Sequence, residues 1–194
     1  MFKLLLSFFL LFTAYSAPRQ SVVNTDPVRE KLILHADQLK AYAITQKCSS
    51  HIGILVDMSI PSRKKRLFVI NLETDSVLVS GLCAQGQGND VNREDVVFSN
   101  KPGSYCTAEG RYKFGDKFVG EFGPGFRLYG LDPTNNNALN RFIVFHYHPG
   151  VGDEEDAKVV CRSNGCPMVS PKVFARTEKL IDVEDKPVLM WIYK

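Results

Sequence analysis

The sequence lacks several features that would place it in a common class of protein. No apolar run reaches the ~20 residues that a membrane-spanning helix needs, and no Gly-x-Ser-x-Gly motif of a serine hydrolase occurs. Lysine and arginine form no stripe interleaved with aromatic residues, so we expect no nucleic-acid partner. The 24 basic residues nearly balance the 21 acidic ones, and no internal repeat is evident. The chain has the length of one domain with a proper hydrophobic core.

The first residues are typical of a secretory signal peptide. Met1-Phe2-Lys3 is a short positive start, and residues 4–12 are apolar except for Ser7, a core too short to span a membrane. The small residues that follow favour cleavage after Ser16; the alternative is an uncleaved anchor. We therefore expect residues 1–16 to be a signal peptide and the protein to be exported to the periplasm or cell envelope. No cysteine lies near the cut, so we expect no lipid attachment and no membrane contact after cleavage.

The rest of the chain is predicted to be mainly β, with an N-terminal amphipathic helix. Residues 17–50 are expected to form a tether and this helix, because Thr25 or Asp26 precedes Pro27 and apolar residues, Val28 among them, then recur at helical spacing. Residues 51–194 are expected to form one folded domain. Short apolar runs predict its strands at 52–58, 67–72, 76–79, 103–107, 126–129, 141–146 and 188–193.

Two charged runs stand out from the otherwise mixed surface pattern. We interpret the basic run 63–66 as a solvated hairpin turn and the acidic run 153–156 as a solvated loop. A sharper hypothesis makes the basic run a patch that steers the protein to an anionic polymer such as a cell wall.

Five cysteines in an exported chain leave at least one thiol unpaired. If Cys166 is that thiol, the other four, Cys48, Cys83, Cys106 and Cys161, allow three pairings, among which the sequence does not choose. Cys83 and Cys106 lie in apolar, strand-like surroundings and can equally be buried free thiols.

The candidate chemistry lies in residues 162–167, downstream of an apolar run that ends in a histidine. Cys166 directly follows Gly165, so its backbone N–H lies in an open turn, and His146 ends the apolar run. A thiol, an imidazole and backbone N–H groups are the parts needed for acyl transfer through a thioester. The N–H groups of Gly165 and Cys166 are candidates for binding the oxyanion.

Two histidines compete for the role of base. Strand alternation puts His146 and His148 on the same face, so spacing alone does not separate them. We favour His146, which lies inside the apolar run, over His148, which abuts Pro149 and Gly150. The chosen histidine is expected to take the thiol proton and to form an ion pair with the Cys166 thiolate.

Two other interpretations of the same residues stay open. Cys161 and Cys166 are close enough in sequence for a local disulfide, which would leave the histidines without chemistry. Alternatively, His146, His148, Cys161 and Cys166 are four ligands of the types that zinc takes.

Several ordered motifs resemble those of one known family. His146, followed after about twenty residues by Ser163-x-Gly165-Cys166, resembles the active-site signature of the L,D-transpeptidase (YkuD-type) catalytic domain, in its murein L,D-transpeptidase branch. The likeness runs from about Leu55 to the C-terminus. Further matching stretches are Val56-Asp57-Met58-Ser59, Arg66-Leu67-Phe68-Val69, Leu128-x-Gly130-Leu131 and Arg162-Ser163-x-Gly165-Cys166-Pro167.

The resemblance implies a role for each site residue. Cys166 would be the nucleophile and His146 the base, while Ser163 and Gly165 would shape the turn. Arg162 would line the site and is a candidate to bind a substrate carboxylate, and His148, Asn164 and Tyr147 are expected to contact substrate as well. Two departures are Tyr147, where glycine is common, and Gln85, which stands where a histidine is expected.

The resemblance also implies a fold and an activity. The fold would be a β-sandwich or barrel, and the activity that of a peptidoglycan L,D-transpeptidase acting on stem peptides as a monomer without a cofactor. Cys166 would attack the carbonyl of the third stem-peptide residue, release the terminal D-alanine, and pass the acyl group to an amine. Alternatives are an L,D-carboxypeptidase, a zinc-binding domain and a non-catalytic cell-wall-binding domain. Covalent capture by carbapenems is a further implied property.

Overall fold

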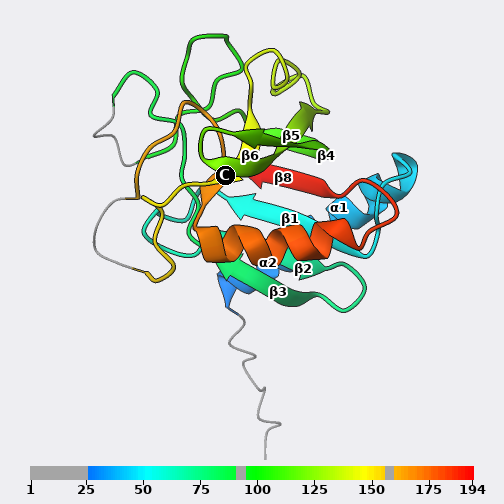
Figure 1. Ribbon diagram of the computed structural model, residues 1–194. Coiled ribbons are helices and arrows are strands. Elements are labelled where there is room, and N and C mark those ends of the chain that lie inside the picture. The colour runs from blue at the N-terminus through cyan, green and yellow to red at the C-terminus, as the bar shows by residue number, and fades with distance from the viewer. Residues whose placement is uncertain (1–25, 91–94, 156–159) are drawn as a thin grey trace, which may run out of the picture.

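A single mixed sheet of eight strands forms the body of the computed structural model, which describes residues 26–90, 95–155 and 160–194 (Figure 1). The sheet has the order β3-β2-β1-β8-β4-β5-β6-β7 and a barrel-like curvature, which confirms the predicted mainly β fold. Its strands are β1 Ile52–Asp57, β2 Leu67–Asn71, β3 Ser76–Gly81, β4 Gly110–Gly120, β5 Gly123–Gly130, β6 Val144–Tyr147, β7 Met168–Val169 and β8 Leu189–Tyr193. The expected signal peptide and most of the tether lie outside the described residues.

Strand β1 lies in the interior of the sheet and is buried along its whole length. It pairs in parallel with β8 and antiparallel with β2, and β2 continues into β3 as the predicted hairpin. The side chain of Asn71 accepts hydrogen bonds from the N–H groups of Glu73 and Thr74 at 2.9 and 3.0 Å, and Asp75 adopts φ 56°. Asn and Asp favour such turns because their short polar side chains bond the local backbone.

Helix α1, Pro27–Thr45, covers one face of this central region. Asp26 caps it by accepting the N–H of Val28 at 3.0 Å, which confirms the predicted start. Its buried residues are Leu32, Ala36, Leu39 and Ala43, which pack against Leu55, Ile70, Leu72 and Leu189. Val28, which we included in the apolar stripe, is exposed instead.

Helix α2, Pro171–Asp182, covers the opposite face and was missed from the sequence. Ser170 caps it by accepting the N–H of Val173 at 3.2 Å, and Pro171 occupies the first turn. Val173 and Phe174 pack into the main core with Ile54 and Val56, which point away from the α1 side of β1. A Ser-Pro pair before an amphipathic stretch is a helix start signal, so the sequence did contain the evidence.

Two predicted strands differ in the structure. Residues 103–107 contribute only an isolated bridge between Thr107 and Phe98, and the regular strand β4 follows them. The run 141–146 becomes a strand only from Val144, because Phe142 adopts φ 55°. Arg141 anchors the irregular part by donating to the carbonyl oxygens of Ser99 and Cys106 at 2.7 and 2.6 Å.

We had expected both charged runs to be solvated, but each makes specific contacts in the structure. Arg66 is only 1% exposed, and it donates to the carbonyl oxygens of Cys83 and Ile60 and to Gln85 Oε1 at 2.7–3.1 Å. Lys64 instead meets the acidic run, with its Nζ 2.8 Å from Glu155. This pairing offsets part of the charge that the cell-wall steering hypothesis relies on.

All five cysteines are free thiols, so neither a local Cys161–Cys166 disulfide nor any of the three pairings is formed. Cys48, Cys83 and Cys106 are buried, and Cys161 and Cys166 are half-buried. No helix in the described part of the chain has the length and apolarity to cross a membrane.

Candidate active site

Parallel pairing of β6 and β7 brings the cysteine turn to the histidine. His146 is the register partner of Met168, two residues beyond Cys166. A cleft of about 260 Å³ opens there, lined by Phe122, Met168 and six predicted site residues: His146, His148, Arg162, Ser163, Asn164 and Cys166. The fold thus joins residues that the sequence separates by about twenty positions.

The turn that carries Cys166 is fixed from within by a serine. Ser163 Oγ donates to the carbonyl oxygen of Cys166 at 2.7 Å and accepts the N–H of Gly165 at 3.1 Å. Gly165 adopts φ 122°, and a Cβ there would lie 2.7 Å from the carbonyl oxygen of Cys106. Ser163 therefore holds the turn through two hydrogen bonds, and glycine is required at 165.

A second segment supports the turn from outside. Ser163 N–H donates to the carbonyl of Gln85 at 2.9 Å, and Gln87 N–H donates to the carbonyl of Ser163 at 2.8 Å, around a bridge at Gly86. A Cβ on Gly86 would lie 2.3 Å from the carbonyl oxygen of Tyr105. Gln85 is buried and accepts from Arg66, so at this position the side chain supports the scaffold and does not line the cleft.

The two histidines hold opposite tautomers, which separates their roles. His146 Nδ1 lies 2.9 Å from the carbonyl oxygen of Tyr147, and because a carbonyl only accepts, Nδ1 carries the proton and Nε2 is basic. His148 Nδ1 lies 3.0 Å from the N–H of Gly150, and because an amide N–H only donates, the proton of the neutral ring is on Nε2. Of the two rings, His146 therefore has a basic Nε2.

The electrostatic surroundings favour a neutral Cys166 thiol and a neutral His146 imidazole in the resting protein. Burial raises the pKa of the Cys166 thiol, against the smaller effects of the Val144 N–H and the Arg141 charge. Burial also lowers the pKa of His146. The charge of His148 lowers this pKa further, whereas the hydrogen bond to the Tyr147 carbonyl raises it. Both shifts oppose the ion pair that we expected from the sequence, because desolvation disfavours each charged form.

Two aromatic residues, Tyr147 and Phe122, lie near the cleft in positions that the sequence did not indicate. Tyr147 was expected to contact substrate, but its ring packs 5.6 Å from Phe174 and is not part of the cleft; its carbonyl oxygen is what reaches the site. Phe122, at the tip of the β4–β5 hairpin, was not predicted. Its ring stacks on His146 at 5.8 Å and meets His148 edge-on at 4.8 Å. No periodic signal marks this loop residue, so only the fold reveals it.

The remaining polar groups of the turn complete the cleft. Asn164 is exposed, and its Oδ1 accepts from the side chain of Gln87 at 3.0 Å. On the thiol side, Cys166 Sγ lies 3.6 Å from the carbonyl oxygen of Phe142, whose left-handed backbone directs that oxygen at the sulfur. An apolar cavity of about 150 Å³ adjoins the cleft and shares Phe122 and His146 with it.

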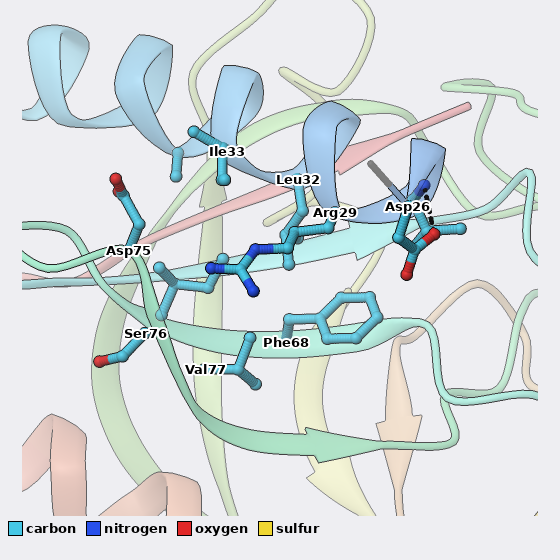
Figure 2. A pocket seen from close by; sticks show the side chains of 11 residues that line it. Asp26, Arg29, Leu32, Ile33, Phe68, Asp75, Ser76 and Val77 are labelled. Atoms are coloured by element: carbon cyan, nitrogen blue, oxygen red, sulfur yellow. Dashed lines mark hydrogen bonds between the residues drawn. The ribbon is translucent and has the colours of Figure 1, made fainter. Parts of the chain in front are cut away.

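A larger cavity of about 470 Å³ lies elsewhere, between α1 and the strands β2 and β3 (Figure 2). Leu32, Phe68 and Val77 line it, and the side chain of Arg29 extends into it. None of the candidate site residues lines it. Size alone therefore does not locate the chemistry in this protein.

The four residues considered as zinc ligands do not converge. Within residues 26–90, 95–155 and 160–194, no group of three or more His, Cys, Asp or Glu side chains is arranged to hold a metal ion. Instead, Cys166 and His146 flank the cleft, while the Cys161 sulfur lies 3.6 Å from His148 Nδ1.

Comparison with known proteins gives one family and a group of solved structures. The model of the L,D-transpeptidase catalytic domain matches residues 25–193. No curated protein matched the chain. Similar solved structures include an L,D-transpeptidase from Stackebrandtia nassauensis, with 15% identity and a TM-score of 0.42 over 84% of this chain and 67% of that one. Another is the helical cell shape determining protein Pgp2 from Campylobacter jejuni, with 13% identity and a TM-score of 0.47 over 80% of this chain and 55% of that one.

Proposed function

Because this chain belongs to the L,D-transpeptidase catalytic domain family, we propose that it is an exported peptidoglycan L,D-transpeptidase with Cys166 as nucleophile and His146 as base. The supporting observation is the tautomer of His146. Its Nδ1–H is fixed on the Tyr147 carbonyl, so the basic Nε2 belongs to a ring that lines the same cleft as the Cys166 thiol. A base oriented by a third group beside a nucleophile is the arrangement that activates a thiol.

The reaction starts from a neutral thiol and a neutral imidazole. As the thiol sulfur attacks the carbonyl carbon of the third stem-peptide residue, its proton passes to His146 Nε2. The imidazolium then gives this proton to the amine of the departing D-alanine, which leaves a thioester on Cys166. An amine of a second stem attacks the thioester, loses a proton to His146, and the sulfur regains it.

The oxyanion of each tetrahedral intermediate needs a hydrogen-bond donor. The N–H of Gly165 donates to Ser163 Oγ, so it is already engaged. This leaves the N–H of Cys166, in the same turn, as the donor that we assign to the oxyanion. Preorganised donors of this kind need no rearrangement during the reaction, which is why the turn is fixed so tightly.

The cleft residues outside the reacting pair are assigned to substrate binding. Arg162 supplies a cation for a stem-peptide carboxylate, and Asn164 supplies an amide at the exposed edge. Phe122 covers both imidazole rings and offers an apolar contact to the substrate. The stem peptides of the cell envelope are the proposed partner, and no cofactor takes part in the proposed steps.

Covalent capture tests this function. After incubation with a carbapenem, intact mass spectrometry should show one drug molecule on the wild-type protein and none on Cys166→Ala. Cys48→Ala is the matched control, because Cys48 is packed under α1 and should not affect capture. A carbapenem adduct on Cys166→Ala would show that Cys166 is not the nucleophile. The same conclusion would follow if the wild-type protein changed the muropeptide profile but formed no adduct.

Product analysis separates the alternatives. Incubation with purified sacculi should yield new cross-links, and trimmed stems without cross-links would identify a carboxypeptidase. Binding to sacculi with an unchanged muropeptide profile would favour a wall-binding module. One equivalent of zinc in the purified protein would favour a zinc-binding domain.

A further inference from the structure

A second thiol and imidazole lie in contact beside the reacting pair. Cys161 Sγ is 3.6 Å from His148 Nδ1, and both groups are half-buried. The N–H of Gly150 donates to the same nitrogen at 3.0 Å. A Cβ on Gly150 would lie 3.0 Å from His148 Nδ1 and 3.1 Å from Cys161 Sγ, so the three residues are in close mutual contact. Two donors thus converge on one side of the His148 ring.

Cys161 does not have the surroundings of a second nucleophile. It does not line the cleft, whereas His148 does. It packs with the cluster formed by Leu82, Val151 and Met168. Burial raises the pKa of its thiol, which keeps the S–H group available as a donor. The polar contact that the structure records for this thiol is the one to His148.

A contact with Phe122 also restrains the His148 ring. The Phe122 ring meets it at 63° with the centroids 4.8 Å apart, which restrains its orientation. With both donors on Nδ1, the proton of the neutral ring is on Nε2. His148 is therefore a hydrogen-bond donor at the wall of the cleft that holds Cys166.

We propose that Cys161 is a positioning residue whose thiol, with the Gly150 N–H, fixes His148 so that Nε2–H binds an oxygen atom of the acyl-donor peptide. This inference rests on the proposed function for its substrate. Under this proposal the two thiol–imidazole pairs have different roles. Cys166 and His146 take part in the reaction, whereas Cys161 orients His148, which binds the acyl-donor peptide.

Kinetics with a stem peptide test the binding role. Cys161→Ala should raise KM by about threefold to tenfold, the effect of one lost hydrogen bond, and leave kcat within about twofold. Cys161→Ser keeps a donor and should restore most of the wild-type KM. In a His148→Gln background, Cys161→Ala should add almost nothing, because both changes remove one contact. Additive effects of the two changes, or a wild-type KM in Cys161→Ala, would overturn the proposal.

Nitrogen NMR of the imidazole rings tests the positioning independently of activity. Neutral His148 should show the Nε2–H pattern and His146 the Nδ1–H pattern. The Nδ1 resonance of His148 should move in Cys161→Ala and stay near its wild-type position in Cys161→Ser. An Nδ1–H pattern for His148, or an unmoved resonance in Cys161→Ala, would contradict the proposal. If the wild-type protein forms no carbapenem adduct, the proposed function fails, and with it the proposed contact between His148 and the peptide. The nitrogen NMR spectrum then still decides whether Cys161 positions His148.

Discussion

At the scale of single residues, hydrogen-bond partners decide what each histidine does. His146 lies in β6 and His148 directly follows that strand, yet a carbonyl oxygen fixes one ring and an amide N–H fixes the other. The bond to Tyr147 makes His146 basic at Nε2, and the bond to Gly150 makes His148 a donor there. These opposite tautomers support the proposal that His146 acts as a base and His148 as a binding group.

Replacing the two histidines one at a time should show this division. His146→Gln should slow acylation of Cys166 by ~10²–10⁴, the usual cost of losing a general base. His148→Gln should slow it by about tenfold, the effect of one hydrogen bond. Stopped-flow acylation with a carbapenem measures both rates. If the His148 variant is the inactive one, the roles are reversed.

The pH dependence of acylation follows from the two pKa directions. His146 accepts a proton only when it is neutral, and its lowered pKa keeps it neutral as pH falls past its ordinary value of 6.5. The raised pKa of Cys166 keeps the thiol protonated at neutral pH. We expect a broad plateau of kcat/KM with its acid limb below 6.5. An acid limb above pH 6.5, together with thiolate absorbance at neutral pH, would instead support an ion pair between Cys166 and His146.

At the scale of secondary elements, α2 is tied to the segment that carries the site. Its cap residue, Ser170, directly follows β7 and also donates to Asp153 in the acidic loop. The cap thus connects α2, β7 and the loop before the cysteine turn. Phe174 from the same helix packs at 5.5 Å against Phe145, the neighbour of His146.

Removing this cap should lower stability more than activity. Ser170→Ala should lower the free energy of unfolding by ~1–2 kcal/mol, because the first turn of α2 loses its acceptor. For a chain of this size that is a fall in Tm of about 2–8 °C. Ser170→Thr is the matched control and should keep most of the stability, and calorimetry measures both. A Tm of Ser170→Ala equal to that of wild type would show that the cap has no part in stability.

At the scale of the whole molecule, one buried cation connects the sheet to the active site. Arg66, directly before β2, donates to the carbonyl of Cys83 after β3 and to Gln85, whose own carbonyl accepts the N–H of Ser163. Burial lowers the pKa of Arg66 to about 10, so the guanidinium stays charged at neutral pH. The scaffold behind the turn that carries Cys166 therefore depends on a residue of the basic run.

Arg66→Met should be strongly destabilising, whereas its neighbour should not. The change leaves the buried Cys83 carbonyl without its donor and should lower the free energy of unfolding by ~2–4 kcal/mol. Lys64→Met removes an exposed ion pair with Glu155 and should change it by less than about 1 kcal/mol. Denaturant titrations compare the two. Equal changes in the free energy of unfolding for the two variants would contradict a structural role of Arg66 and support the solvated position that we expected from the sequence.

Local sequence patterns determined the outline of this protein. The short apolar runs predicted β1, the β2–β3 hairpin and β8, because strand formation follows local alternation and turn residues. The Gly165-Cys166 pair and the histidine at the end of an apolar run indicated the two residues that we propose to react, and the fold places both at one cleft. The same patterns predicted α1, and Ser170-Pro171 is the local signal that marks the start of α2.

Only the tertiary structure decided how those residues work together. The tautomers of His146 and His148 depend on two backbone groups, one on the last residue of β6 and one in the turn that follows it. The burial of Arg66 and the stacking of Phe122 arise from contacts between segments far apart in the sequence. Charge state and hydrogen-bond direction depend on every neighbour in space, whereas secondary structure depends mainly on neighbours in the chain. The sequence therefore indicated the thiol and the imidazole, and the fold determined the cleft that they share and the hydrogen-bond partner of each ring.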